Sequence, residues 1–481
     1  MPKSEADESD PPWITAVLTL ANYLLLIVMG AVRDVMDYLH VRTSEAKNQG
    51  YANLLNSWQA FYTRRLYLRI QDCFNRPIDG PPGAWVSVME RDFDAAQEQQ
   101  MKLTSSSVQC LNLGSYNYLG FAESELDMRS EVCESMRRLG VSSCSSRSEL
   151  GTTDDHVALE RSVASFLGKP AAIVFGMGFA TNSLVLPALT GRGDLILSDC
   201  LNHSSIVTGA KHSQACVRVF QHNSPESLRR LLRAAIAHGQ PRTRRPWKKI
   251  LVCVEGLYSM EGAICKLPEI VTVCKRYKAY LFVDEAHSIG ALGATGRGVA
   301  EHTGVSPDAV DCFMGTFTKS FGSVGGYIAS SQEVIDILKR KCTGHIEACS
   351  ISPACAKQAF LALQLIHGKD GTTRGQEKLA AIKRNANLFR AGLEKIGLQV
   401  IGSPDSPVIP ALLFNPAKIP AFSRECFRRK LAVVVVGYPA TPLLKARIRF
   451  CVSAAHTEED LKSALRVIEI VSKQCLIQYK R

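Results

Sequence analysis

The feature that most constrains the fold is an alternation, from about residue 106 onward, of short apolar runs with longer helical stretches. Most runs are followed closely by Gly, Asp, Glu or Ser, as buried parallel strands are when their carboxyl ends carry functional groups. The pattern predicts a doubly wound α/β sheet with ligands at the strand ends. The predicted strands are Ala171–Phe175, Asp194–Leu197, Ile250–Val254, Tyr280–Val283, Cys312–Met314 and Tyr327–Ala329.

A second, smaller α+β unit is predicted after a long helical segment from Pro353 to about Ile396. Its strands are expected near Ile409–Phe414, Val433–Val436 and Arg447–Val452. A chain of 481 residues has room for several domains. We therefore divide it into an N-terminal anchor and connector (1–105), a large domain (106–352), and a linking helix with a small C-terminal domain (353–481).

The residues between Asp10 and Arg33 carry no charge and include the apolar run Trp13–Val32. Roughly 20 apolar residues cross a bilayer as one helix. Acidic residues precede this run, where a signal peptide has basic ones. Arg33, Arg42 and Lys47 follow it, so the positive-inside rule places the body of the protein in the cytosol. A helix that lies in the membrane interface or packs on a partner is the alternative.

The charge and cysteine content leave several classes open. Lys and Arg number 57 against 45 Asp and Glu, and a net charge of +12 suits nucleic acid, an anionic membrane surface or phosphorylated substrates. None of the 16 cysteines stands in a Cys-x-x-Cys pair. They are predicted to be mostly buried free thiols in a reducing compartment, with neither a zinc site nor a disulfide framework.

Two segments carry the chemistry, and the first allows two interpretations. Residues 283–288 read VDEAHS after an apolar strand, and in a helicase D-E-A-H would be the acidic magnesium motif. A helicase also needs G-x-x-x-x-G-K-[ST] to bind the phosphates, and the sequence contains no match to it. The helicase interpretation is therefore excluded.

The second interpretation is a pyridoxal 5'-phosphate (PLP) site. Residues 315–322 read GTFTKSFG and place Lys319 among small residues, as a lysine that forms a Schiff base requires. Asp284, at the end of a predicted strand, can keep a pyridine nitrogen protonated. The segment FGMGFATN at 175–182 follows a strand and opens a helix, whose amides suit a phosphate. The three elements together predict a PLP enzyme.

At these residues the chain resembles the α-oxoamine synthases, PLP enzymes that condense an amino acid with an acyl-CoA and release CO2. The resemblance extends from about residue 108 to 472 and includes SYNYLG at 115–120 and EGLYSMEG at 255–262. It implies the fold-type I architecture, a large mixed-sheet domain with a smaller C-terminal α+β domain. Three further segments are similar to the catalytic long-chain-base subunits of eukaryotic serine palmitoyltransferases: PRTRRPWKKI at 241–250, VVVVGYPATP at 433–442 and RFCVSAAHT at 449–457.

The resemblance implies a role for each residue of the cofactor site. Lys319 would hold PLP and later take the Cα proton of serine. Asp284 would pair with the pyridine nitrogen, and His287 would hydrogen-bond the ring hydroxyl. His203 would stack on the ring and touch the substrate carboxylate. The amides of Gly178 and Phe179, with Thr316, would hold the phosphate, and Thr318 is a further cofactor-binding residue.

On the substrate side the resemblance implies that Arg449 binds the carboxylate. Arg447 is the alternative, because the two are spaced i, i+2 on one strand face. Asn117, Glu255 and Ser259 would line the same side. No metal ligand set is predicted.

The implied reaction is the decarboxylative condensation of L-serine with palmitoyl-CoA to 3-ketosphinganine, the first step of sphingolipid synthesis. Another α-oxoamine synthase, resembling aminolevulinate or amino-oxononanoate synthase, is the alternative. A non-catalytic membrane scaffold is a third possibility, and the joint presence of Lys319, Asp284, His203 and His287 argues against it. The resemblance also implies an endoplasmic reticulum location, a lysine-less homologous partner subunit and small membrane regulators.

The chain departs from the family pattern in several places. Glu347 and Cys349 replace an aromatic residue and a threonine that normally helps bind the neighbouring subunit's cofactor phosphate. A partner without its own lysine would not need that contact. Lys445 stands where soluble relatives often have glycine, which the sequence does not explain.

Overall fold

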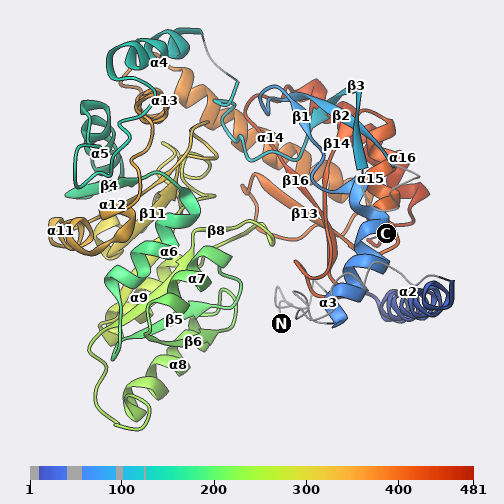
Figure 1. Cartoon of the computed structure of the whole chain (residues 1–481), viewed down its shortest axis with the longest axis horizontal. Coiled ribbons are helices and arrows are strands. Elements are labelled where there is room, and N and C mark those ends of the chain that lie inside the picture. The colour runs from blue at the N-terminus through green and yellow to red at the C-terminus, as the bar shows by residue number, and fades with distance from the viewer. Residues whose placement is uncertain (1–9, 41–56, 94–100, 124–125, 481) are drawn as a thin grey trace.

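Two α/β bodies lie side by side in the molecule (Figure 1). The structure is a computed structural model that describes residues 10–40, 57–93, 101–123 and 126–480. The larger body surrounds a sheet from the middle of the chain, and the smaller combines the C-terminal part with strands from the N-terminal part. Side chains from both bodies can therefore meet between them.

Seven strands of the described chain form the large sheet, in the order β4-β12-β11-β10-β7-β5-β6. Neighbouring strands are parallel, except that β12 runs antiparallel to β11 and β4. The predicted mixed, doubly wound sheet is thus confirmed. The strands are β4 (Ala171–Phe175), β5 (Leu195–Asp199), β6 (Cys216–Phe220), β7 (Ile250–Glu255), β10 (Tyr280–Asp284), β11 (Cys312–Thr316) and β12 (Gly326–Ser330).

Helices cover this sheet and bury its apolar side chains in two clusters. Local signals set several helix ends; for example, a capping box at Thr153 begins α5, and Gly168, with a φ of 66°, ends it. The helices are α4 (Leu126–Leu139), α5 (Asp154–Leu167), α6 (Gly178–Leu189), α7 (Ser204–His212), α8 (Pro225–His238), α9 (Leu267–Tyr277), α10 (Val299–His302), η4 (Pro307–Ala309), α11 (Gln332–Lys341), α12 (Thr343–Ile346) and α13 (Pro353–Ile366).

The helical segment predicted after residue 353 is interrupted. Helix α13 ends at Ile366, and α14 (Arg374–Ile396) begins after a turn. Gly368 and Gly371 have φ values of 70° and 77°, which are left-handed and incompatible with a continuous right-handed helix. Helix α14 then leads into the smaller body, as predicted.

The smaller body contains strands from both ends of the chain. Strands β1 (Ile78–Asp79), β2 (Trp85–Phe93) and β3 (Met101–Asn112) form a sheet with β14 (Leu431–Ala432), in which β3 pairs with β14. The predicted division at residue 105 therefore falls inside β3. The remaining elements are β13 (Val408–Phe414), α15 (Lys418–Arg428), β15 (Val434–Val436), β16 (Ala446–Cys451) and α16 (Glu458–Gln474).

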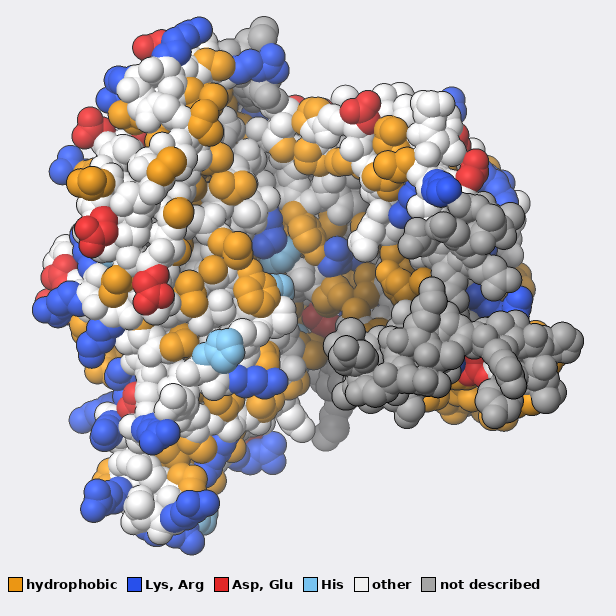
Figure 2. Space-filling view, in the orientation of Figure 1, with side chains coloured by type: hydrophobic (Ala, Val, Ile, Leu, Met, Phe, Trp, Pro, Cys, Tyr) orange, Lys and Arg blue, Asp and Glu red, His pale blue; other side chains and the backbone are white. Residues whose placement is uncertain are grey.

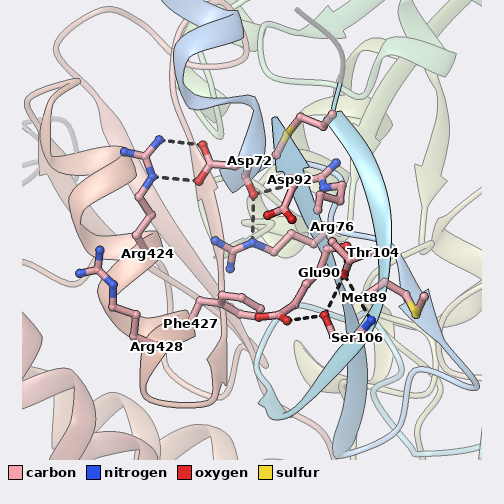
Figure 3. A pocket seen from close by; sticks show the side chains of 12 residues that line it. Asp72, Arg76, Met89, Glu90, Asp92, Thr104, Ser106, Arg424, Phe427 and Arg428 are labelled. Atoms are coloured by element: carbon pink, nitrogen blue, oxygen red, sulfur yellow. Dashed lines mark hydrogen bonds and ion pairs between the residues drawn. The ribbon is translucent and has the colours of Figure 1, made fainter. Parts of the chain in front are cut away.

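A cation–carboxylate pair joins the N-terminal part to this body (Figure 3). Elements α3 (Ser57–Tyr62), η2 (Thr63–Tyr67) and η3 (Leu68–Cys73) precede β1. Asp72 accepts two hydrogen bonds from Arg424 of α15, at 2.7 and 2.8 Å, and the Arg76 guanidinium lies 4.3 Å from the ring centre of Phe427. These residues border a cavity of about 280 Å³. It is lined by both acidic and basic side chains and lies apart from Lys319.

The N-terminal helix α2 (Trp13–His40) contains a segment long and apolar enough to cross a membrane. The most apolar 18-residue stretch within residues 13–36 has a mean hydropathy of 2.1, and only 17% of it is buried against the rest of the chain. Asp34 pairs with Arg64 of η2 at 2.9 Å. Lys445 lies 3.3 Å from Asp10, just before the helix, which gives this lysine a contact that the sequence did not suggest. The positive-inside residues Arg42 and Lys47 lie outside the described residues.

Candidate functional site

The candidate site lies between the two bodies, where β10 and β11 end. Figure 2 shows histidine and basic side chains in the hollow that separates them. A cavity of about 380 Å³ opens there beside Lys319. It is lined by Pro82, Gly114, Ser115, Tyr116, Asn117, Ala122, Thr318, Lys319, Gly322 and Ser323.

Asp284 is the last residue of β10 and is buried. One carboxylate oxygen accepts a hydrogen bond from the Asn182 side chain at 2.7 Å, and the other accepts one from the Ala286 amide at 2.8 Å. Burial lowers the pKa of Lys319, and the Arg449 charge adds to this, whereas Asp284 and Glu255 oppose it. The structure therefore places a lysine that loses its proton more easily than usual close to a fixed carboxylate.

The start of α6 and the end of β11 form a small polar cradle. Gly178 is the first residue of α6, and a Cβ added there would lie 2.6 Å from the Thr316 hydroxyl oxygen. Thr181 donates the hydrogen bond to the Met177 carbonyl, so the amides before it point out of the helix end. The Thr316 and Thr318 hydroxyls lie 2.8 Å apart beside it. Because the Thr316 hydroxyl also donates to the Gly325 carbonyl at 2.9 Å, the donors that remain for a phosphate are chiefly the amides that open α6.

His287 is buried between two tyrosines. Its Nδ1 lies 2.8 Å from the Tyr118 hydroxyl, and its ring meets the Tyr116 ring edge-on at 4.7 Å. Burial lowers the pKa of His287 well below its usual value, and the charges of Lys319 and Arg449 lower it further. The imidazole is therefore neutral and can exchange a hydrogen bond with a bound group.

His203 caps the N-terminus of α7 and has an exposed side chain. Its Nδ1 lies 2.8 Å from the Ser205 hydroxyl, and its ring meets Phe179 edge-on at 5.9 Å. Its backbone N–H donates to Glu255, the last residue of β7, at 2.5 Å. Partial desolvation lowers the pKa of His203, and burial raises that of Glu255 well above its usual value, with Asp284 adding to the effect. The open ring face is free to stack on a planar ligand.

The two arginines of β16 have different surroundings. Arg447 donates to the Met260 carbonyl at 2.8 Å and to Glu261 at 3.2 Å. The Arg449 guanidinium lies 4.7 Å from the centre of the Tyr116 ring, and its buried Nε has no hydrogen-bond partner among the described residues. Arg449 therefore retains a donor for a ligand, whereas Arg447 is occupied.

Asn117 and Ser259 lie close to this group. The Asn117 side chain borders the cavity but is already bonded to the Pro82 carbonyl and the Ala122 amide. Burial raises the pKa of Tyr116 to about 12, although Arg449 and a hydrogen bond with Ser259 oppose the shift. The predicted residues are thus brought into one region.

Sequence reasoning missed Asn182 and Tyr116. Asn182 orients Asp284, and Tyr116 lies between Lys319, His287 and Arg449, with the Lys319 nitrogen 5.8 Å from its ring centre. Both stood in motifs already singled out, FGMGFATN and SYNYLG. Only the fold reveals their partners, which are distant in sequence.

Comparison with known proteins agrees with this geometry. Residues 108–468 match the family model of aminotransferase class I and II. Long chain base biosynthesis protein 2a of Oryza sativa subsp. japonica is 56% identical, over 97% of this chain and 96% of its own. Serine palmitoyltransferase 2 of Dictyostelium discoideum is 47% identical, over 98% and 96%. The structure of Sphingomonas wittichii serine palmitoyltransferase has a TM-score of 0.77 at 28% identity, and the match covers 89% of this chain and all of that one.

The fold and the site together define a fold-type I PLP enzyme. The residues fit the cofactor, because the cradle at Gly178 would be filled by a Cβ and Asp284 is fixed facing the lysine. A high-resolution SPT structure with PLP matches this chain with a TM-score of 0.76 at 27% identity, over 89% of this chain and all of that one. The chain belongs to the aminotransferase class I and II family, within the group of long chain base biosynthesis proteins 2 and serine palmitoyltransferases 2.

Proposed function

We propose that this chain catalyses the condensation of L-serine with palmitoyl-CoA, which yields 3-ketosphinganine, CoA and CO2. One observation carries the proposal: Lys319 of the larger body and Arg449 of the smaller body lie 5.8 and 4.7 Å from the same Tyr116 ring. An amino-acid substrate bound there has its Cα near an amine and its carboxylate near a guanidinium. The names of the relatives support the choice of serine and a long-chain base.

The cofactor would be held by Lys319, by Asp284 at its ring nitrogen, by His287 at its ring hydroxyl and by the cradle at its phosphate. When bound, PLP supplies an electron-withdrawing ring that stabilises negative charge at Cα. Asp284 keeps its position through Asn182 and the Ala286 amide. Lys319 takes the proton from Cα of serine, because its lowered pKa leaves the amine unprotonated more often.

Two residues bind the carboxylate that is later lost as CO2. Arg449 offers its unpartnered Nε, and the exposed ring of His203 covers the ligand from the large body. Glu255 fixes His203 by accepting a hydrogen bond from its backbone. A carboxylate held between them is oriented while the Cα proton is removed.

The acyl chain would bind in a second, largely apolar cavity of about 400 Å³. It borders Arg449 and shares Gly114 and Ser115 with the cavity at Lys319. Nine of the other twelve lining residues are apolar and come from β1, β2, β14, β15 and the segments next to β1 and β15; the polar ones are Asn75, Arg76 and Asn112. A long alkyl chain gains free energy by leaving water for such surroundings.

Enlarging Val434 tests this assignment. The Val434→Phe variant is expected to favour acyl-CoAs several carbons shorter than palmitoyl-CoA, because the ring fills part of this cavity. The measurement is the ratio of kcat/KM for lauroyl-CoA to kcat/KM for palmitoyl-CoA. This ratio should rise about tenfold, because the smaller cavity no longer buries several methylene groups of the longer chain. An unchanged ratio would show that the acyl chain does not bind in this cavity. Val219→Phe, at an exposed position of β6, is the matched control.

The partner is proposed to be a lysine-less homologous subunit. Exposed apolar side chains gather on two segments, at Val141 and Leu150 and at Ile346. The segments touch, because the Ser350 amide donates to the Ser145 carbonyl at 3.0 Å. Such a surface is typical of a subunit interface, and the predicted departure at Cys349 lies within it, exposed. Small membrane regulators are proposed as further partners.

The membrane is proposed to be that of the endoplasmic reticulum, with the body in the cytosol. Support comes from α2, whose large apolar side chains are widely exposed, among them Trp13 at 76% and Leu24 at 64%. An anchored enzyme would release its lipid product close to a bilayer. All 16 cysteines are free, as a reducing compartment would keep them.

Product analysis tests the proposed function. The purified full chain, with and without a co-expressed lysine-less homologue, is supplied with labelled L-serine or glycine and with acyl-CoAs of several lengths. We expect a labelled 3-ketosphinganine from serine and palmitoyl-CoA. Efficient use of glycine with a short acyl-CoA would instead indicate another α-oxoamine synthase.

A further inference from the structure

A short hairpin of the larger body reaches into the smaller one (Figure 1). It consists of β8 (Leu257–Tyr258) and β9 (Ala263–Ile264), with residues 259–262 at its tip. The tip is closely packed: Gly262 has a φ of 63°, and a Cβ there would lie 2.5 Å from the Val408 carbonyl oxygen. A Cβ at Gly402 would lie 2.6 Å from the Glu261 carbonyl oxygen. The tip therefore cannot shift without moving β13 or the residues before it.

The tip contacts both arginines of β16. Arg447 donates from one terminal nitrogen to the Met260 carbonyl and to Glu261, and from Nε to the Lys445 carbonyl at 3.1 Å. The Met260 sulfur lies 3.3 Å from a terminal nitrogen of Arg449. Two adjacent residues thus fix one arginine with strong bonds and touch the other, which faces Tyr116.

Glu261 also interacts electrostatically with His222 of the larger body. Burial raises its pKa, whereas Arg447 and His222 oppose the shift. His222 lies between strands of the large sheet and the hairpin, with its Nδ1 3.0 Å from Asp199 and its ring 4.4 Å from that of Tyr258. The Glu261–Arg447 pair thus connects the large sheet to β16. Only 4% of the Arg447 side chain is exposed, so water screens the pair weakly.

We propose that Glu261 and Arg447 are positioning residues that set Arg449 at the distance at which it binds the carboxylate of the amino-acid substrate. The inference rests on the proposed function, because it presumes that Arg449 binds this carboxylate. Arg447 and Arg449 are two residues apart on β16, so their side chains leave the strand on the same face. Only Ile448 separates them on the strand, so a displacement of the Arg447 backbone also displaces that of Arg449. Arg447 is thereby an anchor and not a second carboxylate ligand.

The test uses Glu261→Gln and Arg447→Lys, two variants of nearly unchanged size. The apparent Kd for L-serine, read from the visible absorbance change of the holoenzyme, is expected to rise about tenfold, as for one lost charge-assisted hydrogen bond. The Kd for serinol, which has the amine and hydroxyl groups but no carboxylate, should not change. Glu459→Gln, which removes the exposed Glu459–Arg466 pair, is the matched control.

Two results would overturn the positioning role. One is an unchanged Kd for serine in both variants, and the other is an equal loss of serine and serinol binding, which would indicate only a structural role. Arg449→Lys serves as the reference variant. If it does not weaken serine binding, the proposed role of Arg449 is wrong; if it does, but Glu261→Gln and Arg447→Lys do not, only the present inference fails.

Discussion

Replacing Lys319 with alanine is expected to lower turnover by about 10³-fold or more and to remove the visible absorbance that borohydride bleaches. Proton transfer by a positioned side chain contributes about 10²–10⁴-fold to the rate of an enzyme reaction. The variant also lacks the amine that would bond covalently to the cofactor. Its surroundings explain the choice of this lysine: burial lowers its pKa beside the fixed carboxylate of Asp284. The measurements are the absorbance spectrum of the purified protein before and after borohydride, and the initial rate of product formation.

Lys169 provides a matched control for this experiment. It is also partly buried, with a pKa lowered by burial, but its amine donates to the Val310 carbonyl at 2.6 Å, away from the candidate site. Lys169→Met should keep the absorbance and the activity. If Lys319→Ala retains a bleachable band of normal height, another residue holds the cofactor and the site is wrongly assigned.

The second large effect is expected for Asp284→Asn. The amide has nearly the same shape but no charge, so it cannot keep a pyridine nitrogen protonated. Removing one well-placed electrostatic contact in an active site lowers kcat by about 10²–10³-fold, and we expect a fall of that size. The measurement is kcat with saturating serine and palmitoyl-CoA, together with the amount of PLP bound.

Asp155→Asn is the control for the charge change. Asp155, in the first turn of α5, is similarly buried, but its carboxylate accepts a hydrogen bond from the Ser135 hydroxyl of α4. This variant should keep its turnover. A normal kcat in Asp284→Asn with full PLP content would show that this carboxylate does not act on the cofactor.

Much of the larger body could be predicted from periodicity. Its buried strands are short apolar runs, and all six predicted ones overlap the structure within one residue at their start and two at their end. Strand β6 was missed because CVRVF contains Arg218 and exposes alternate side chains, as edge strands do. The break between α13 and α14 was missed because glycine in a helical pattern does not by itself fix a turn.

The remaining features depend on contacts between distant residues. Pairing of β3 with β14 joins residues 111–112 to 431–432, and no local pattern indicates it. Asp284 and Lys319 stood out because each lies in a motif, whereas Asn182 and Tyr116 gain their roles only from neighbours that the fold supplies. The same applies to Arg447, which the sequence could rank only as the alternative to Arg449 and which the hairpin tip occupies.

The most direct test of the central claim follows the carboxyl carbon of serine. L-serine labelled at that carbon is incubated with the purified PLP-loaded protein, with its lysine-less partner if one is needed, and palmitoyl-CoA is then added. We expect labelled CO2 and unlabelled 3-ketosphinganine in equal amounts, only when palmitoyl-CoA is present and not with Lys319→Ala. Release of labelled CO2 at the same rate without acyl-CoA, or retention of the label in the lipid product, would contradict the decarboxylative condensation of serine with palmitoyl-CoA.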